Sequence, residues 1–352
     1  MALVFAGGSD ILTWNTALSG NWNDATKWTP NNVPDAANEV AVIPTGTVTM
    51  NVSPAISALQ ITSLPGTLNL AGNTLDLLGP DPSFNSGFII GNAGNAVING
   101  AFENRADGAI RIQAGTSLTF SGPSLVNDGL ITVNFNGGAF GTNITFGSTM
   151  TVTGGALQIL GGVLKGSGTV VAAIVNDNGG SIEPGASVGR MAITGILTNN
   201  SQGIVKMEVG GLTAATEHDQ ITVGGTGANG AASFDGKIEV DLINGFAPVV
   251  GDAATLMTYR FLSGRFQEAD IPSLTGIRLR LQYLGTSLRL IALDENALGD
   301  TNGDGCVDDT DLAAVLAAFG LIGAAMAEDA NDDGFVDDID LAIVLERFGL
   351  GC

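Results

Sequence analysis

Charged residues are scarce in this 352-residue chain, at 14% of the sequence, and aromatic residues make up only 6%. Histidine occurs once and cysteine twice, and the cysteines do not form a C-x-x-C pair, which argues against a zinc site. No uninterrupted apolar run reaches the roughly 18 residues expected of a membrane-spanning helix. The chain also lacks the G-x-x-x-x-G-K-[ST] motif, so a nucleotide-binding P-loop is not expected.

The formal net charge is −22, and the acidity is concentrated near the end of the chain. From Asp294 to Cys352 there are fifteen Asp or Glu residues and one Arg, whereas residues 1–293 hold twenty acids and twelve bases. A nucleic-acid partner is disfavoured, because its phosphates are bound by Lys and Arg. The acidic block instead indicates a divalent cation.

Glycine is abundant, at 51 residues, and suits short strands joined by tight turns because it adopts positive φ angles without strain. Between residues 51 and 293, short segments alternate apolar and polar residues, as in Ala109–Ile112, Ser117–Phe120 and Leu130–Asn134. Clusters of Gly, Asn and Asp separate these segments, and helical periodicity is absent. The pattern predicts a mainly β domain, either a β-solenoid or a β-sandwich, in which Asn side chains form hydrogen bonds at the bends.

One stretch of this domain is more distinctive. Residues 161–195 contain a Gly-Ser-Gly-Thr turn at Gly166–Thr169, an Asn-Gly bend at Asn176–Gly180 and Pro-Gly-x-Ser-x-Gly at Pro184–Gly189. This stretch resembles the rungs of secreted bacterial parallel β-helix proteins, including autotransporter passengers. The resemblance implies a right-handed parallel β-helix that covers roughly residues 60–293.

A different kind of sequence lies at each end of the expected solenoid. All three tryptophans, Trp14, Trp22 and Trp28, lie within residues 1–50, which we interpret as an N-terminal cap. The alternative is a surface on which sugar rings stack. Residues 277–293 alternate around Leu-Gly-Thr-Ser and predict a closing hairpin. Its polar face carries three arginines that we expect to guard a solvated edge: Arg278, Arg280 and Arg289.

Residues 294–352 form a third expected domain and carry the most specific signal. Two twelve-residue segments, Asp300–Asp311 and Asp329–Asp340, start 29 residues apart and follow one pattern. An EF-hand loop supplies oxygen ligands to calcium from positions 1, 3, 5, 7, 9 and 12, around a Gly at position 6. Gly305 and Gly334 occupy position 6 here. The pattern predicts two bound Ca²⁺ ions, held by side chains or, at position 7, by backbone carbonyls of these residues: Asp300, Asn302, Asp304, Cys306, Asp308, Asp311, Asp329, Asn331, Asp333, Phe335, Asp337 and Asp340.

An apolar segment after each loop predicts a helix, over Leu312–Phe319 and Leu341–Phe348, with Gly320 and Gly349 as C-terminal caps. No helix of ordinary length is expected before the first loop. This duplicated loop and helix, without a leading helix, resembles a dockerin, and Asp at position 12 is also similar to dockerins. The resemblance covers residues 299–350 and implies a calcium-stabilised module that docks to a protein partner such as a cohesin.

The partner contacts of dockerins correspond to loop positions 10 and 11, which are Asp309 and Thr310 in the first loop and Asp338 and Ile339 in the second. Neither pair is the Ser/Thr type known for cohesin-binding dockerins. A cohesin-like partner is therefore one possibility, and a different surface protein, self-association or the chain's own solenoid are the others.

The ends of a dockerin lie close together, so the resemblance also implies that Cys306 and Cys352 can meet. We predict a disulfide between them, with two free thiols as the alternative. Val307 and Val336, at loop position 8, are expected to pair the two loops through a short β-bridge. A disulfide and calcium sites of moderate affinity both suit a secreted, extracellular or cell-surface protein. Because Met1–Gly8 shows no intact signal peptide, a cytosolic protein is the alternative.

Polysaccharide lyases and hydrolases also occur among β-helix proteins, and they need clustered carboxylates with Arg or Lys. The densest set of such residues suits a polar strand face equally well: Glu103, Arg105, Asp107 and Arg111. We interpret Glu183 as a single carboxylate at a turn, without a catalytic partner. His218 lies between Glu217 and Asp219, but we expect no G-x-S-x-G elbow to support a catalytic triad with it. We therefore expect a non-catalytic protein.

The sequence thus predicts a secreted structural or adhesive surface protein, in which a β-solenoid carries a calcium-binding module for assembly, including assembly into an extracellular filament. The alternative is a polysaccharide-binding or polysaccharide-degrading β-helix that docks to a complex through the same module.

Overall fold

The computed structural model describes residues 9–15, 18–123, 125–135, 148–225, 229–295, 297–331 and 333–352. Met1–Gly8, where the signal peptide was sought, lies outside the described residues. Within these residues the fold is mainly β, with parallel sheets and two α-helices, as the sequence predicts. Its contacts divide the chain into two units, Met1–Ile182 with Ala192–Gly195 and Glu183–Met191 with Ile196–Cys352, which are described separately. The sequence-based boundaries at residues 50 and 293 stay predictions.

The strands of the first unit belong to two sheets. One sheet contains β1 (Asp10–Trp14), β3 (Trp28–Thr29), β4 (Glu39–Ile43), β6 (Ala55–Ile56), β7 (Ala58–Ile61), β9 (Thr74–Leu77), β10 (Phe84–Asn85), β12 (Asn95–Asn99), β13 (Phe102–Asn104), β15 (Ser117–Ser121), β16 (Leu125–Asn127), β18 (Thr149–Leu160) and β20 (Gly168–Asp177). The other contains β2 (Gly20–Asn21), β5 (Thr47–Thr49), β8 (Thr67–Asn69), β11 (Phe88–Gly91), β14 (Ala109–Gln113), β17 (Leu130–Phe135) and β19 (Val163–Gly166). A short 3₁₀ helix, η1 (Ala25–Lys27), lies near the N-terminus. Two further strands, β21 (Ser181–Pro184) and β22 (Arg190–Thr194), have residues in both units.

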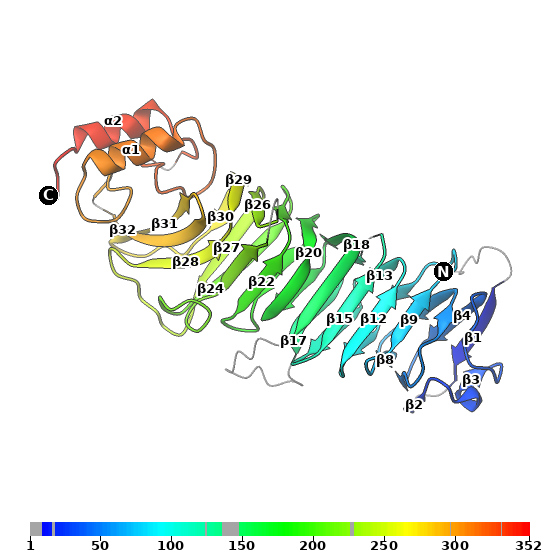
Figure 1. Ribbon diagram of the computed structural model, residues 1–352. Helices are drawn as coiled ribbons and strands as arrows, with labels where there is room; N and C mark the ends of the chain where they lie inside the picture. The colour runs from blue at the N-terminus through cyan, green and yellow to red at the C-terminus, as the bar shows by residue number, and fades with distance from the viewer. Residues whose placement is uncertain are drawn as a thin grey trace. The chain divides into compact units, whose positions relative to one another are not determined.

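Successive rungs of the first unit pair in parallel along three ladders. One ladder runs through β4, β7, β10, β13 and β16, a second through β9, β12 and β15, and a third through β5, β8, β11, β14 and β17. Figure 1 shows β9, β12 and β15 side by side. The long strand β18 pairs with both β15 and β16 and so joins two ladders. Parallel pairing between rungs is consistent with a β-solenoid and differs from the antiparallel sheets of a β-sandwich.

Apolar side chains stack from rung to rung inside this unit. Alternation along each strand sends every second side chain inward, and the ladder register places inward residues directly over one another. One column of partners is completely shielded from solvent: Val48, Leu68, Ile89, Ile110, Ile131 and Leu164. Because such stacking removes apolar area from water, each rung stabilises the next one.

Asparagine side chains form a second internal stack, which the sequence predicts in outline. The Asn85 side-chain amide donates to Asn104 Oδ1 at 2.8 Å, and the Asn104 amide donates to Asn127 Oδ1 at 2.7 Å. All three side chains are buried. In the next rung the equivalent position is Ile159, so the ladder stops there and the Asn127 amide donates to the Gly129 carbonyl. These bonds satisfy polar groups that would otherwise be costly to bury.

The three tryptophans pack against one another at the start of the first unit. Trp28 lies edge-on to both Trp14 and Trp22, with ring centroids 5.1 Å and 5.2 Å apart. The Trp28 indole N–H donates to the Trp22 carbonyl, and all three rings are buried. Rings with no exposed face cannot stack on sugars, so this arrangement supports the cap and is at odds with a sugar-stacking surface.

The second unit continues the parallel pattern and ends in an antiparallel hairpin. Its strands are β23 (Leu197–Asn199), β24 (Ile204–Val209), β25 (Gln220–Gly224), β26 (Ala231–Phe234), β27 (Lys237–Leu242), β28 (Ala253–Thr258), β29 (Phe261–Gly264), β30 (Glu268–Asp270), β31 (Ile277–Leu284) and β32 (Ser287–Asp294). Parallel ladders join β23 to β26 and β29, and β24 to β27 and β30. The expected hairpin is formed by β31 and β32, and β32 also pairs antiparallel with β28.

The two helices start earlier than the sequence suggests. α1 spans Asp309–Ala318 and α2 spans Asp338–Glu346, whereas the apolar periodicity placed their first residues at Leu312 and Leu341. The difference arises because the last turn of each loop is already helical. Among the described residues, no helix is both long and apolar enough to cross a membrane.

We predict that Asn104→Ala lowers the free energy of unfolding by about 2–3 kcal/mol, because it removes the acceptor of the shorter Asn85 hydrogen bond and the donor to the buried Asn127 Oδ1. Urea unfolding followed by tryptophan fluorescence measures the effect. Asn95→Ala is the matched control, since Asn95 is exposed and should change stability by no more than about 0.5 kcal/mol. Equal effects of the two variants would contradict a stabilising ladder.

Candidate metal centre in the C-terminal module

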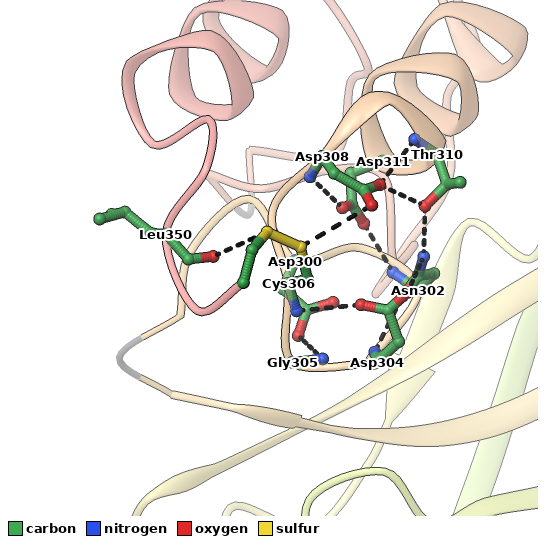
Figure 2. Close-up of a disulfide and its surroundings, with 10 residues drawn as sticks. Asp300, Asn302, Asp304, Gly305, Cys306, Asp308, Thr310, Asp311 and Leu350 are labelled. Carbon is green, nitrogen blue, oxygen red and sulfur yellow. Dashed lines mark hydrogen bonds between the residues drawn. A yellow bond between two sulfur atoms is a disulfide. The ribbon is translucent and has the colours of Figure 1, made fainter.

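The first acidic loop is folded around its own aspartates (Figure 2). The Gly303 and Gly305 N–H groups donate to the two carboxylate oxygens of Asp300 at 2.7 and 3.0 Å. The Cys306 N–H donates to Asp304 Oδ1 at 2.9 Å. Gly305 has φ of +89°, a conformation that a residue with a side chain adopts only with strain, so glycine is required at this turn.

The second loop repeats this arrangement 29 residues later. The Gly334 N–H donates to Asp329 Oδ2 at 2.8 Å, and the Phe335 N–H donates to Asp333 Oδ1 at 2.9 Å. Gly334 has φ of +88°, matching the first loop. The two segments therefore fold in the same way, as their shared sequence pattern predicts.

Loop positions 9 and 12 also cap the helices. Asp308 is the N-cap of α1, and its backbone N–H donates to Asp311 Oδ2 at 3.0 Å. Asp337 and Asp340 form the same capping box on α2, at 2.8 Å. Such boxes satisfy N–H groups that a helix leaves unpaired at its start. The residues expected to bind metal thus also determine where each helix begins.

Several of these carboxylates are removed from water. Asp311 and Asp340 are 0% exposed and Asp300 is 1% exposed. Burial raises the pKa of Asp300, and the negative charges of Asp311 and Asp304 raise it further, while the Gly303 and Gly305 N–H groups oppose the shift. In contrast, the Thr310 hydroxyl and N–H lower the pKa of Asp308. The first loop therefore concentrates negative charge in a region that is largely shielded from solvent.

The donor set fits calcium in its chemistry. Both loops offer carboxylate, amide and backbone oxygens, the ligands that a hard divalent cation takes. Within the described ranges, however, no three His, Cys, Asp or Glu side chains converge closely enough to hold a metal ion. In the first loop these oxygens accept hydrogen bonds from the loop backbone instead.

Each loop is joined to the other repeat, and not to the other loop. The backbone of Val307 pairs with Gly349 and Leu350, at 2.7 and 2.9 Å, and that of Val336 pairs with Gly320 and Leu321, at 2.7 and 3.0 Å. The direct Val307–Val336 bridge expected from the sequence is wrong, because the N–H and carbonyl of both valines are used in these bonds. Gly320 and Gly349, expected as helix caps, have φ of +80° and +85° and reverse the chain for this pairing.

The disulfide between Cys306 and Cys352 is present, as predicted (Figure 2). The pairing of Val307 with Leu350 brings the two cysteine Cα atoms to 4.7 Å. Gly351 lies so close to the Gly305 carbonyl that a Cβ could not fit there. In the other repeat Ile322 and Phe335 form a β-bridge at the corresponding place, without a disulfide. Only the first loop is therefore held by a covalent bond.

The segment between the loops adds an edge to the terminal hairpin. The Leu281 N–H in β31 donates to the Ala325 carbonyl at 2.7 Å, and the Ala327 N–H donates back to the Leu281 carbonyl at 3.1 Å. Met326 is completely buried, and Ala327 packs with Ile291 and Leu293. The module is therefore fastened to β31, within its own unit.

This contact corrects the expected role of the hairpin arginines. Arg278 donates through Nη1 to the Ala330 carbonyl at 3.1 Å, and both Arg278 and Arg280 are partly buried. The β31 edge is covered by residues 325–327, so it is not the solvated edge that the sequence suggested. In the sequence, the apolar run at residues 321–327 is the feature that indicates a buried segment here.

The surface of the module exposes many large apolar side chains. Eight large apolar side chains between residues 316 and 350 are at least half exposed: Leu316, Phe319, Ile322, Phe335, Ile339, Leu345, Phe348 and Leu350. Leu316 and Leu345, and likewise Phe319 and Phe348, are related by the 29-residue repeat. The four residues expected to contact a partner are also exposed: Asp309, Thr310, Asp338 and Ile339.

The residues considered for catalysis have structural partners. Glu103 and Arg105 form an ion pair at 3.3 Å, Arg111 lies over the Phe88 ring, and Glu183 pairs with Lys206 at 3.6 Å. Asp107 is exposed at a turn. The structure does not gather these side chains into one site.

The segment Gly185–Gly189 does match G-x-S-x-G, but the strand β22 follows it where a nucleophile elbow would require a helix. His218 is buried, and its two ring nitrogens face the carbonyl oxygens of Gly211 and Thr255. It therefore does not face Ser187 as the base of a catalytic triad would.

No protein-family model matches this chain, and no curated protein matches it.

We predict that the unreduced protein carries no alkylatable thiol by mass spectrometry, and that it gains two after unfolding in reductant. Cys352→Ser should destabilise the module by about 3–4 kcal/mol, since the disulfide closes a loop of 46 residues. Thermal unfolding of the variant and of the reduced protein should agree. Two reactive thiols in the untreated protein would overturn the assignment.

Proposed function

We propose that this chain is a secreted, non-catalytic surface protein, in which a right-handed parallel β-solenoid carries a calcium-stabilised, dockerin-like module for assembly. The observation that carries the proposal is the duplicated loop. Two segments of one sequence pattern fold alike and bury carboxylates, and the helices that follow them carry or adjoin exposed apolar side chains.

Each loop would hold one calcium ion. Cys306 and Phe335, at position 7, would bind through their backbone carbonyls. The other ligands would be side chains: Asp300, Asn302, Asp304, Asp308 and Asp311 in one loop, and Asp329, Asn331, Asp333, Asp337 and Asp340 in the other. The ion would supply positive charge to carboxylates that are buried and lie close together, and burial first, then the charges of Asp311 and Asp304, raise the pKa of Asp300. Binding therefore favours the folded module.

Docking is supported by the exposed apolar side chains of α1, α2 and the segments beside them. Isolated exposed apolar residues are ordinary, but eight within one small acidic module indicate a protein-binding surface. Asp309, Thr310, Asp338 and Ile339 lie at the starts of the two helices and would contact the partner. The partner is a second copy of the chain or a cohesin-like surface protein.

Export from the cell is supported by the disulfide, because such bonds persist in oxidising environments. Calcium is also plentiful outside cells, where modules of moderate affinity stay loaded. The polysaccharide alternative has less support, since the three tryptophans that could stack on sugars are buried.

We expect isothermal titration of the metal-free protein to show two calcium ions per chain. Asp311→Asn and Asp340→Asn should each remove one ion, because each takes away the carboxylate at position 12 of one loop. Asp309→Asn is the matched control, since Asp309 is an exposed neighbour outside the ligand set and should leave both ions bound. If the wild-type protein bound no calcium, the proposal would be contradicted.

Electron microscopy with and without EGTA tests the self-assembly version. If the partner is a second copy, polymers should form with calcium and disperse when it is chelated, because the loops hold the docking helices in place. Monodisperse monomers under both conditions would exclude the filament and leave a separate partner protein. Pull-down with cohesin domains then distinguishes a cohesin from other partners.

A further inference from the structure

The disulfide of the module is attached to the first acidic loop at one of its expected ligand positions. Cys306 is at loop position 7, whose backbone carbonyl is an expected calcium ligand, and its sulfur is bonded to that of Cys352. The Cys306 N–H donates to Asp304 Oδ1 at 2.9 Å, and the Cys306 sulfur lies 3.7 Å from Asp308 Oδ2 (Figure 2). The disulfide-bonded residue therefore contacts the side chains at loop positions 5 and 9.

The second loop is held differently at the same place. By the 29-residue repeat, Cys306 corresponds to Phe335 and Cys352 corresponds to Gly323. In the second loop the contact is a hydrogen bond, which the Gly323 N–H donates to the Gly334 carbonyl at 3.1 Å. The residues that follow Gly323 pair with β31. Noncovalent bonds thus support the second loop from the hairpin, and a thiol reagent cannot break them.

We propose that the disulfide selectively tightens calcium binding by the first loop, so that its reduction releases calcium from this loop before the second. The inference rests on the proposed function, in which both loops bind calcium. A loop that adopts its binding-competent shape for only part of the time has an apparent affinity reduced by that fraction. The disulfide restricts the shapes open to positions 5 to 9 of the first loop, and the second loop has no such bond.

The disulfide is accessible to a small thiol reagent, since Cys352 is exposed and Cys306 is partly exposed. A dithiol attacks one sulfur as its thiolate and ends as a cyclic disulfide. Its two electrons and two hydrogens pass to Cys306 and Cys352, which become free thiols. Because Asp308 and Asp311 of the same loop form the capping box of α1, loss of calcium there loosens the start of that helix and weakens docking.

Amide hydrogen exchange of the calcium-free, full-length wild-type protein, with and without dithiothreitol, tests the restraint without metal and without a variant. Reduction should speed exchange at the Cys306 and Val307 amides about tenfold more than at the Phe335 and Val336 amides, which occupy the same positions of the second loop. Equal acceleration in the two loops, or none in either, would overturn the proposal, because the disulfide would then not act on the first loop selectively.

Calcium titration of two full-length variants gives the second readout. Asp340→Asn keeps the first site and Asp311→Asn keeps the second, so each reports one loop. Dithiothreitol should raise the Kd of Asp340→Asn about tenfold more than that of Asp311→Asn.

Adding Cys306→Ser and Cys352→Ser to Asp340→Asn is the control, since this protein should bind calcium as weakly as the reduced form and be indifferent to dithiothreitol. If the oxidised variants bind no calcium, the proposed function itself fails. If both bind it and reduction weakens both equally, the loops do bind calcium and only the selective role of the disulfide is wrong.

Discussion

Burial of carboxylates in the two duplicated loops is the constraint on which the C-terminal module depends. Asp311 and Asp340 are sealed from solvent, and each accepts hydrogen bonds from the start of its own loop and from the N-cap of its own helix. Taking a carboxylate out of water costs several kcal/mol, which N–H donors offset only in part. A divalent cation is the natural further compensation, and it would act on the loop fold and on the helix starts together.

The rest of the module keeps these loops in position. Each loop is paired with the segment after the other repeat's helix, so the two repeats stabilise each other. The first loop is fixed covalently through Cys306, and the second lies next to the segment that pairs with β31. The apolar face of α1 and α2 is left open by these contacts. The module is thus held by β31, and large apolar side chains on its surface stay exposed.

Much of this arrangement follows from sequence, but not all of it. Short-range patterns predicted the β-rich fold, the terminal hairpin, the asparagine hydrogen bonds and the duplicated loops, because turn chemistry and periodicity are local properties. The disulfide followed from a family resemblance. The pairing of Val307 with Gly349 and Leu350, the covering of β31 by residues 325–327 and the partial burial of Arg278 depend on which distant segments meet. A local pattern can show that a segment is apolar, as at residues 321–327, but not which strand it will cover. The helix starts were misplaced because Asp308 and Asp337 were read only as metal ligands and not also as caps.

Amide hydrogen exchange of the whole protein, with calcium or with EGTA, tests the central claim most directly. The amides of Thr301 and Ala330 donate to the buried carboxylates of Asp311 and Asp340, so they report on each loop separately. Calcium should slow exchange at both amides and through α1 and α2, while the solenoid amides of the first unit keep their rates. Identical protection in the two conditions would show that the loops do not use the metal to fold.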